Sequence, residues 1–128
     1  TMNLIRSIIE TFTHLRNDQN NSLADSVLEY LENNYQDNEL TLSSTAKKFF
    51  INSSYLSRLF SQKNNMTFSK YLIELRLKKA ADLLISSNLK SYEIANDVGF
   101  NDAKYFNTSF KKFYGVTTSE YRLVNAKS

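Results

Sequence analysis

Two segments of the sequence concentrate hydroxyl, amide and cationic side chains at helical spacing. In SSYLSRLFSQK these positions are Ser53, Ser54, Ser57, Arg58 and Lys63. In NDAKYFNTSFKKFY they are Ala103, Lys104, Asn107, Thr108, Lys111 and Lys112. Arginine can pair with guanine O6 and N7, asparagine with adenine and small methyl groups with thymine, whereas lysine suits phosphates. This chemistry indicates contact with double-stranded DNA.

The same side chains also have plainer interpretations. Arg58 could pair with a carboxylate of its own domain, for example Glu74. Lys111 and Lys112 could be a solvated helix end, where cations favour the helix dipole. The Phe and Tyr residues at helical spacing are better explained as core than as platforms for stacked bases. What favours DNA is that the whole pattern occurs twice.

The two segments belong to a repeat with an offset of 50 residues. The matched pairs are Phe60 with Phe110, Asn65 with Gly115, Thr67 with Thr117, Ser69 with Ser119, and Tyr71 with Tyr121. Each copy predicts a short helix, a tight turn and a longer helix. This is the helix-turn-helix layout, in which the second helix presents its outer face to the major groove.

Capping residues predict where these helices begin and end. N-caps are expected at Thr41, at Asn52 or Ser53, and at Asn101 or Asp102. Asn65 and Gly115 stand where a helix ends in the left-handed region, which Gly and Asn tolerate. The side chains expected to point inward are Leu56, Leu59, Phe60, Phe106, Phe110 and Phe113.

Longer helices are predicted before and between the two copies. Residues 67–86 form one helix of about 28 Å, because Ile73, Leu77, Ala80 and Leu84 follow a single buried stripe. Residues 2–16 carry another apolar stripe. The polar run NDQNNS at 17–22 predicts a linker or turn, and a further helix starts at residue 23.

Composition favours an all-α fold and a polyanionic partner. Proline is absent and there are two glycines, so tight hairpins are unlikely. The net charge is −5 over residues 1–42 and +8 over residues 43–128. There is no run of about 18 apolar residues, which argues against a membrane partner. Without cysteine or a catalytic motif, and with His14 as the sole histidine, we expect no enzyme activity, metal or cofactor.

Residues 23–122 resemble the DNA-binding domain of AraC/XylS-type bacterial transcription regulators. The resemblance rests on SSYLSRLF, MTFSKYLIELRLKKAADLL and YEIANDVGFNDAKYFNTSFKKFYGVTTSEYR. It implies seven helices with two helix-turn-helix motifs joined by a long helix, and here an extra N-terminal helix. It also implies transcription regulation, usually activation, in the cytoplasm, with RNA polymerase as a partner. The segment DAKYFNTSFKKFYG is similar to the output domains of response regulators with AraC-type effectors.

The resemblance divides the chain into two parts. Residues 23–128 form the DNA-binding domain, with DNA contacts expected in the two polar segments. Residues 1–22 are an N-terminal helix and a linker to a regulatory domain missing from this chain. The apolar stripe of residues 2–16 either forms a homodimer, packs on another domain or folds back on this same domain. Three residues depart from the family pattern, namely Thr45 for an aliphatic residue, Asn65 for glycine and Thr118 for proline. These departures bear on stability.

A helical protein–protein adaptor is the alternative function. Two apolar stripes precede residue 36, and the first third of the chain is acidic. Either feature could serve docking to a protein. Salt separates the two functions, because a domain that grips phosphates binds DNA with a steep salt dependence and an adaptor does not.

Overall fold

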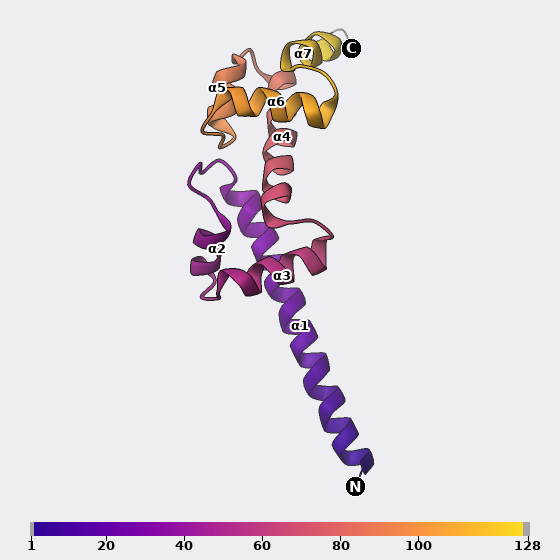
Figure 1. Ribbon diagram of the computed structural model, residues 1–128. Helices are drawn as coiled ribbons and strands as arrows, with labels where there is room; N and C mark the ends of the chain where they lie inside the picture. Colours follow the sequence, from indigo (N-terminus) through magenta and orange to yellow (C-terminus); the bar gives the residue numbers. More distant parts are fainter. Residues whose placement is uncertain (1, 127–128) are drawn as a thin grey trace.

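The computed structural model describes residues 2–126, with the side chains of residues 4–12 and 18–125. These residues fold into α-helices, and no strand occurs among them. The helices are α1 (Met2–Asn34), α2 (Leu42–Lys48), α3 (Ser53–Asn64), α4 (Phe68–Ser86), α5 (Ser91–Asp97), α6 (Ala103–Tyr114) and α7 (Thr118–Ala126). The all-α prediction is confirmed. The two helix-turn-helix units are α2 with α3 and α5 with α6 (Figure 1).

The long helix α4 joins two hydrophobic cores. The core of the first unit contains Val27, Leu31, Leu40, Ala46, Leu56, Phe60, Phe68 and Leu72. The core of the second unit contains Leu77, Ala80, Ala81, Leu84, Ile94, Ala95, Val98, Phe100, Phe106 and Phe110. The N-terminal part of α4 therefore belongs to the first core and its C-terminal part to the second. Tyr35 packs against both cores.

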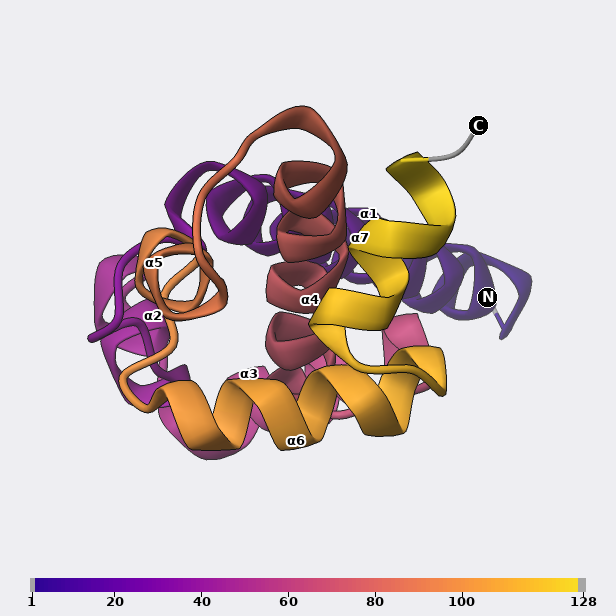
Figure 2. The ribbon, with the colours of Figure 1, turned by 90° about the horizontal axis from the view of Figure 1, so that it is seen from above.

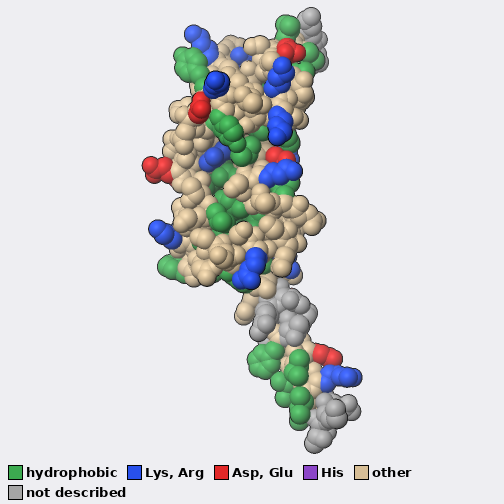
Figure 3. Space-filling model, in the orientation of Figure 1, with side chains coloured by type: hydrophobic (Ala, Val, Ile, Leu, Met, Phe, Trp, Pro, Cys, Tyr) green, Lys and Arg blue, Asp and Glu red, His purple; other side chains and the backbone are tan. Residues whose placement is uncertain are grey.

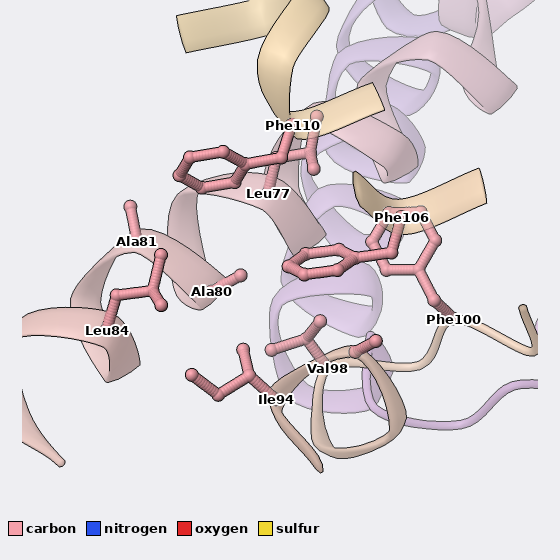
Figure 4. Close-up of a cluster of buried hydrophobic side chains, with 10 residues drawn as sticks. Leu77, Ala80, Ala81, Leu84, Ile94, Val98, Phe100, Phe106 and Phe110 are labelled. Carbon is pink, nitrogen blue, oxygen red and sulfur yellow. The ribbon is translucent and has the colours of Figure 1, made fainter. Parts of the chain in front are cut away.

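The second core places α6 across α4. Phe106 and Phe110 are fully buried and reach from α6 toward Leu77 and Ala80 of α4 (Figure 4). Burying side chains of this size contributes about 1.5–3 kcal/mol each to folding. Small residues on α4 leave room for the two Phe rings, so that the recognition helix lies close to the linker helix.

Most of the predicted helix ends are confirmed. The backbone N–H of Ser44 donates to Thr41 Oγ1 at 3.0 Å, and that of Tyr55 donates to Asn52 Oδ1 at 2.8 Å. Asp102 rather than Asn101 caps α6, accepting from the backbone N–H of Lys104 at 2.9 Å. Asn65 and Gly115 end α3 and α6 in the left-handed region, with φ of 56° and 80°.

Each helix-turn-helix turn closes with the same pair of backbone hydrogen bonds. In the first unit the N–H of Ile51 donates to the carbonyl of Ala46 and that of Phe50 to Lys47. In the second, Phe100 donates to Ala95 and Gly99 to Asn96. This Schellman arrangement requires positive φ at the residue after the cap. Gly99 meets that requirement with φ of 103°, whereas Phe50 adopts φ of 59° with its side chain 95% exposed.

Two expectations are wrong. Residues 17–22 form no linker or turn, because α1 runs unbroken from Met2 to Asn34. In a helix, Asn, Asp, Gln and Ser are each less favourable than Ala by at most about 0.7 kcal/mol. Neither Gly nor Pro interrupts the segment, and Asn20 accepts a hydrogen bond from the Tyr55 hydroxyl at 2.6 Å. Phe113 is 39% exposed at the edge of the second core instead of pointing inward.

We expect Phe50→Asn to stabilise the protein by about 1 kcal/mol, because a bulky residue in the left-handed region is strained and Asn tolerates it. Urea denaturation of both proteins measures the difference. Tyr92→Asn is the matched control, since Tyr92 is an exposed aromatic residue inside α5 and should give no gain. A loss of stability in Phe50→Asn would show that the ring makes a favourable contact.

Candidate nucleic-acid interface

The two recognition helices, α3 and α6, lie on one face of the molecule and run in the same direction. Figure 1 shows α6 in front of α4 and α3 below it, in front of α1. The view from above shows both recognition helices on the same side of α4 (Figure 2). The polar sides of the two recognition helices therefore do not point in opposite directions. On this face Lys and Arg side chains lie over both units and over α4 between them (Figure 3).

The outer side of α3 carries Ser54 and Arg58, both exposed. The buried positions Leu56, Leu59 and Phe60 hold the opposite side against the first core, as expected. Ser53 and Ser57 are half-buried and flank the outer side. Lys63 is exposed, but at 100° per residue it lies about 140° around the helix from Arg58. Arg58 and Ser54 therefore form the centre of this surface, and Lys63 stands apart.

Arg58 is available for a partner outside the domain. Within the described part of the chain, the ion pair with Glu74 does not form. A salt bridge between α4 and α1 joins Lys79 to Glu32 at 2.6 Å, and the hydrogen bond between them raises the pKa of Lys79. Arg58 instead borders a shallow polar pocket with Asn20, Tyr55 and Gln62.

The outer side of α6 is more cationic than that of α3. Lys104, Thr108, Lys111 and Lys112 are all exposed there, while Ala103 is half-buried. The Thr108 hydroxyl donates to the backbone carbonyl of Lys104 at 3.0 Å, which uses its proton and leaves its oxygen able to accept. Three ammonium groups on two turns of helix make a surface suited to phosphates.

Asn107 is exposed but already has a hydrogen-bond partner inside the domain. Its Oδ1 accepts from the Ser91 hydroxyl at 2.8 Å, and Ser91 Oγ accepts from the buried Thr118 hydroxyl at 3.2 Å. The chain of bonds joins α6 to the first residues of α5 and α7. Pairing with adenine requires both the oxygen and the amine of a carboxamide. Such pairing by Asn107 has to share or break the bond from Ser91.

A groove lies between α4 and the recognition helix α6. Lys70, Glu74 and Lys112 line it beside apolar residues, including Ile73 and Phe113. Lys70 was not among the residues selected from the sequence, because the stripe of residues 67–86 identifies only the buried side of that helix. Lys70 stands four residues before Glu74, and this spacing of opposite charges is typical of the exposed side of a helix. That pattern could have identified Lys70 as a surface residue.

The described residues offer no other chemistry at this surface. Among the described side chains, those of residues 4–12 and 18–125, no group of three or more His, Asp or Glu could hold a metal ion. Across the same residues, no helix has the length and apolar character that crossing a bilayer requires.

Comparisons with known proteins agree on one kind of domain. A family model described as a helix-turn-helix domain matches residues 45–123. The Msm operon regulatory protein of Streptococcus mutans is 30% identical over 123 residues, covering 93% of this chain and 44% of that protein. The transcriptional activator RhaR of Mannheimia succiniciproducens is 41% identical over 69 residues, covering 54% of this chain and 25% of that protein. The chain thus spans less than half the length of these curated relatives.

A solved structure supports the same assignment. The C-terminal domain of the two-component response regulator yesN from Fusobacterium nucleatum superposes with a TM-score of 0.76 and 40% identity. The similarity covers 79% of this chain and 98% of that domain. It therefore extends over both helix-turn-helix units and the helix that joins them.

Proposed function

The chain belongs to the AraC-type helix-turn-helix family of DNA-binding transcription regulators, and from that premise we propose that α3 and α6 together bind a specific double-stranded DNA sequence. The observation that carries the proposal is the placement of both recognition helices on one face, with their polar sides exposed. Each helix enters one of two successive major grooves, which lie about 34 Å apart along the duplex.

The two helices have different tasks. Arg58 provides the strongest base-reading group, since its guanidinium can donate to guanine O6 and N7. Ser53, Ser54 and Ser57 bond to bases or phosphates beside it. Lys104, Lys111 and Lys112 neutralise phosphates, and Ala103, Asn107 and Thr108 contact base edges. Lys63, at the end of α3, reaches only the phosphate backbone at the edge of the first groove.

Binding to DNA serves the control of transcription, and we assign the chain to activators. The support is the name of RhaR as a transcriptional activator and the likeness to a response-regulator output domain. The protein acts in the cytoplasm, where it contacts RNA polymerase at a promoter. Residues 1–22 connect the DNA-binding domain to a regulatory domain of a longer protein.

Salt dependence tests the function directly. Sequences bound by the protein are selected from random duplexes, and the affinity for the preferred duplex is then measured at several salt concentrations. Six phosphate contacts or more imply a loss of about 10³-fold between 50 and 200 mM salt. Weak binding with no such dependence would instead favour the protein–protein adaptor.

We expect Arg58→Ala to weaken binding to the preferred duplex by about 1–3 kcal/mol and to flatten the preference at one or two base pairs. Replacing Lys111 and Lys112 by Ala should weaken binding to every duplex alike and lower the salt slope by about two. Titration against preferred and scrambled duplexes separates these effects. If Arg58→Ala lowers both affinities equally, Arg58 binds phosphate rather than a base.

The first half of α1 has an apolar side that suits a second copy of the chain. Ile5, Ile8 and Phe12 are 59%, 48% and 68% exposed, and their spacing of three and four is that of a coiled-coil seam. Hydrophobic side chains follow one side of the projecting end of α1, and charged ones the other (Figure 3). The helix extends away from the DNA-binding domain, so this side does not pack back on it (Figure 1).

Sedimentation of the intact chain tests the dimer. We expect wild type to sediment as a dimer, and the double variant Ile8→Glu with Phe12→Glu as a monomer, because buried carboxylates would repel one another across the seam. Ser7→Glu, on the charged side of the same helix, should leave the dimer intact. A monomer for wild type at about 100 μM, a concentration at which a 1 μM dissociation constant gives mostly dimer, contradicts self-association.

A further inference from the structure

Arg76 is a buried cation that has no part in the proposed DNA surface. It lies in the middle of α4, between the two cores, and is only 9% exposed. Arginine is almost never buried to this extent unless it is paired. Burial lowers the pKa of Arg76, and the nearby Asp37 carboxylate opposes that change. A guanidinium nevertheless stays charged in proteins, so its position needs an explanation.

The partners of Arg76 are backbone carbonyls of the first unit. Its Nε donates to the carbonyl of Tyr35 and its Nη2 to the carbonyl of Asp37, both at 2.9 Å. These carbonyls follow directly after the end of α1 at Asn34, where the helix dipole leaves negative partial charge. The planar fork of arginine suits two such acceptors at once. Arg76 therefore fixes α4 to the end of α1.

The turn of the second unit lies against the same group. A Cβ on Gly99 would come within 2.3 Å of the Tyr35 carbonyl oxygen and 2.8 Å of Arg76 Nε. Beside it, Asn101 Nδ2 donates to the carbonyl of Asn38 at 3.4 Å. The helix-turn-helix turn that precedes α6 thus rests on the α1–α2 loop of the first unit, with the Arg76 side chain between them.

We propose that Arg76, with Tyr35, Asp37 and Gly99, forms a bridge that sets the distance and rotation between α3 and α6. Besides the α4 backbone, the bridge adds a second connection between the units, where the turn at Gly99 meets the carbonyl of Tyr35. This second connection limits how far bending of α4 changes the separation of the units. Its consequence rests on the proposed function, because a fixed separation means that DNA is bound only when its two half-sites have one spacing. Arg76 is a positioning residue and need not touch DNA.

Arg122 provides a matched control. Its Nε donates to the carbonyl of Leu84 at 2.9 Å and its Nη2 to that of Ser87 at 3.2 Å. The chemistry is the same, a guanidinium on the carbonyls at the end of a helix. However, this contact joins α7 to α4 inside the second unit. Its loss should alter the stability of that unit and leave the separation of the two units unchanged.

Distances between spin labels test the bridge without DNA. The chain has no cysteine, so Lys48→Cys on α2 and Asp97→Cys on α5, both exposed, take one label each. We expect a narrow distance distribution for the otherwise native protein and for Arg122→Met, and a distribution at least about twice as wide for Arg76→Met, since positions released from a packed contact gain freedom. Arg76→Lys keeps the charge and one donor nitrogen but loses the planar fork, so its distribution should be intermediate, and it remains usable if Arg76→Met does not fold. Equal widths in native, Arg76→Lys and any folded Arg76→Met protein overturn the proposal.

Duplexes with altered half-site spacing test the consequence. Inserting or removing one base pair between the half-sites should lower the affinity of wild type about tenfold or more, an effect in the range of a mismatched base pair. For Arg76→Lys, we expect the same change in spacing to lower the affinity by less than about threefold. For Arg122→Met, we expect the same loss of affinity as for wild type. A spacing penalty in Arg76→Lys equal to that of wild type contradicts the bridge. If wild type binds no duplex, the proposed function is contradicted instead. The bridge is then tested by the distances between the spin labels, which do not require DNA.

Discussion

One helix, α4, contributes buried side chains to two hydrophobic cores, and the rest of the structure depends on this constraint. Within its 19 residues, α4 buries Phe68 and Leu72 in the first core and Leu77, Ala80 and Leu84 in the second. A helix repeats every 3.6 residues, so the position of each buried residue also fixes the direction in which each core lies. Because α3 and α6 each pack on their own end of α4, the sequence of this helix determines that both recognition helices are presented on the same face (Figures 1 and 2).

The duplicated unit is larger than the helix-turn-helix motif. In each half, a long helix ends, an arginine from a later helix donates two hydrogen bonds to the carbonyls at that end, and a short helix and a recognition helix follow. Arg76 does this for α1 and Arg122 for α4. The two arginines do not match at the offset of 50 residues that relates the recognition helices. The second half reaches the same contact from another position, which shows that the acceptor carbonyls, rather than the donor residue, are the repeated feature.

The sequence predicted what depends on local chemistry. The caps at Thr41 and Asn52 and the left-handed ends at Asn65 and Gly115 were predictable, because each involves residues a few positions apart. The buried sides of α3, α4 and α6 followed from helical periodicity. What was missed depends on contacts across the fold. The helix through residues 17–22 is supported by Tyr55, Asn107 is held by Ser91, and the role of Arg76 depends on a loop some 40 positions away in the chain. The turn of the first unit was predicted but the positive φ of Phe50 within it was not, since a bulky residue is rare where φ is positive.

The uneven charge along the sequence becomes an uneven distribution of charge between two sides of the folded protein. The first 42 residues have a net charge of −5, and most of them belong to α1, which runs on the side of α4 away from α6 (Figure 2). Glu32 turns toward α4 and pairs with Lys79 there. An α-helix with its side chains is about 10 Å across, close to the Debye length at physiological salt. Carboxylates behind α4 therefore act more weakly on the opposite face than the lysines of α6, which lie on that face themselves. The positive potential on that face is therefore higher than the net charge of +3 suggests. We expect the second unit to supply most of the attraction to phosphates, and Arg58 of the first unit to supply most of the base recognition.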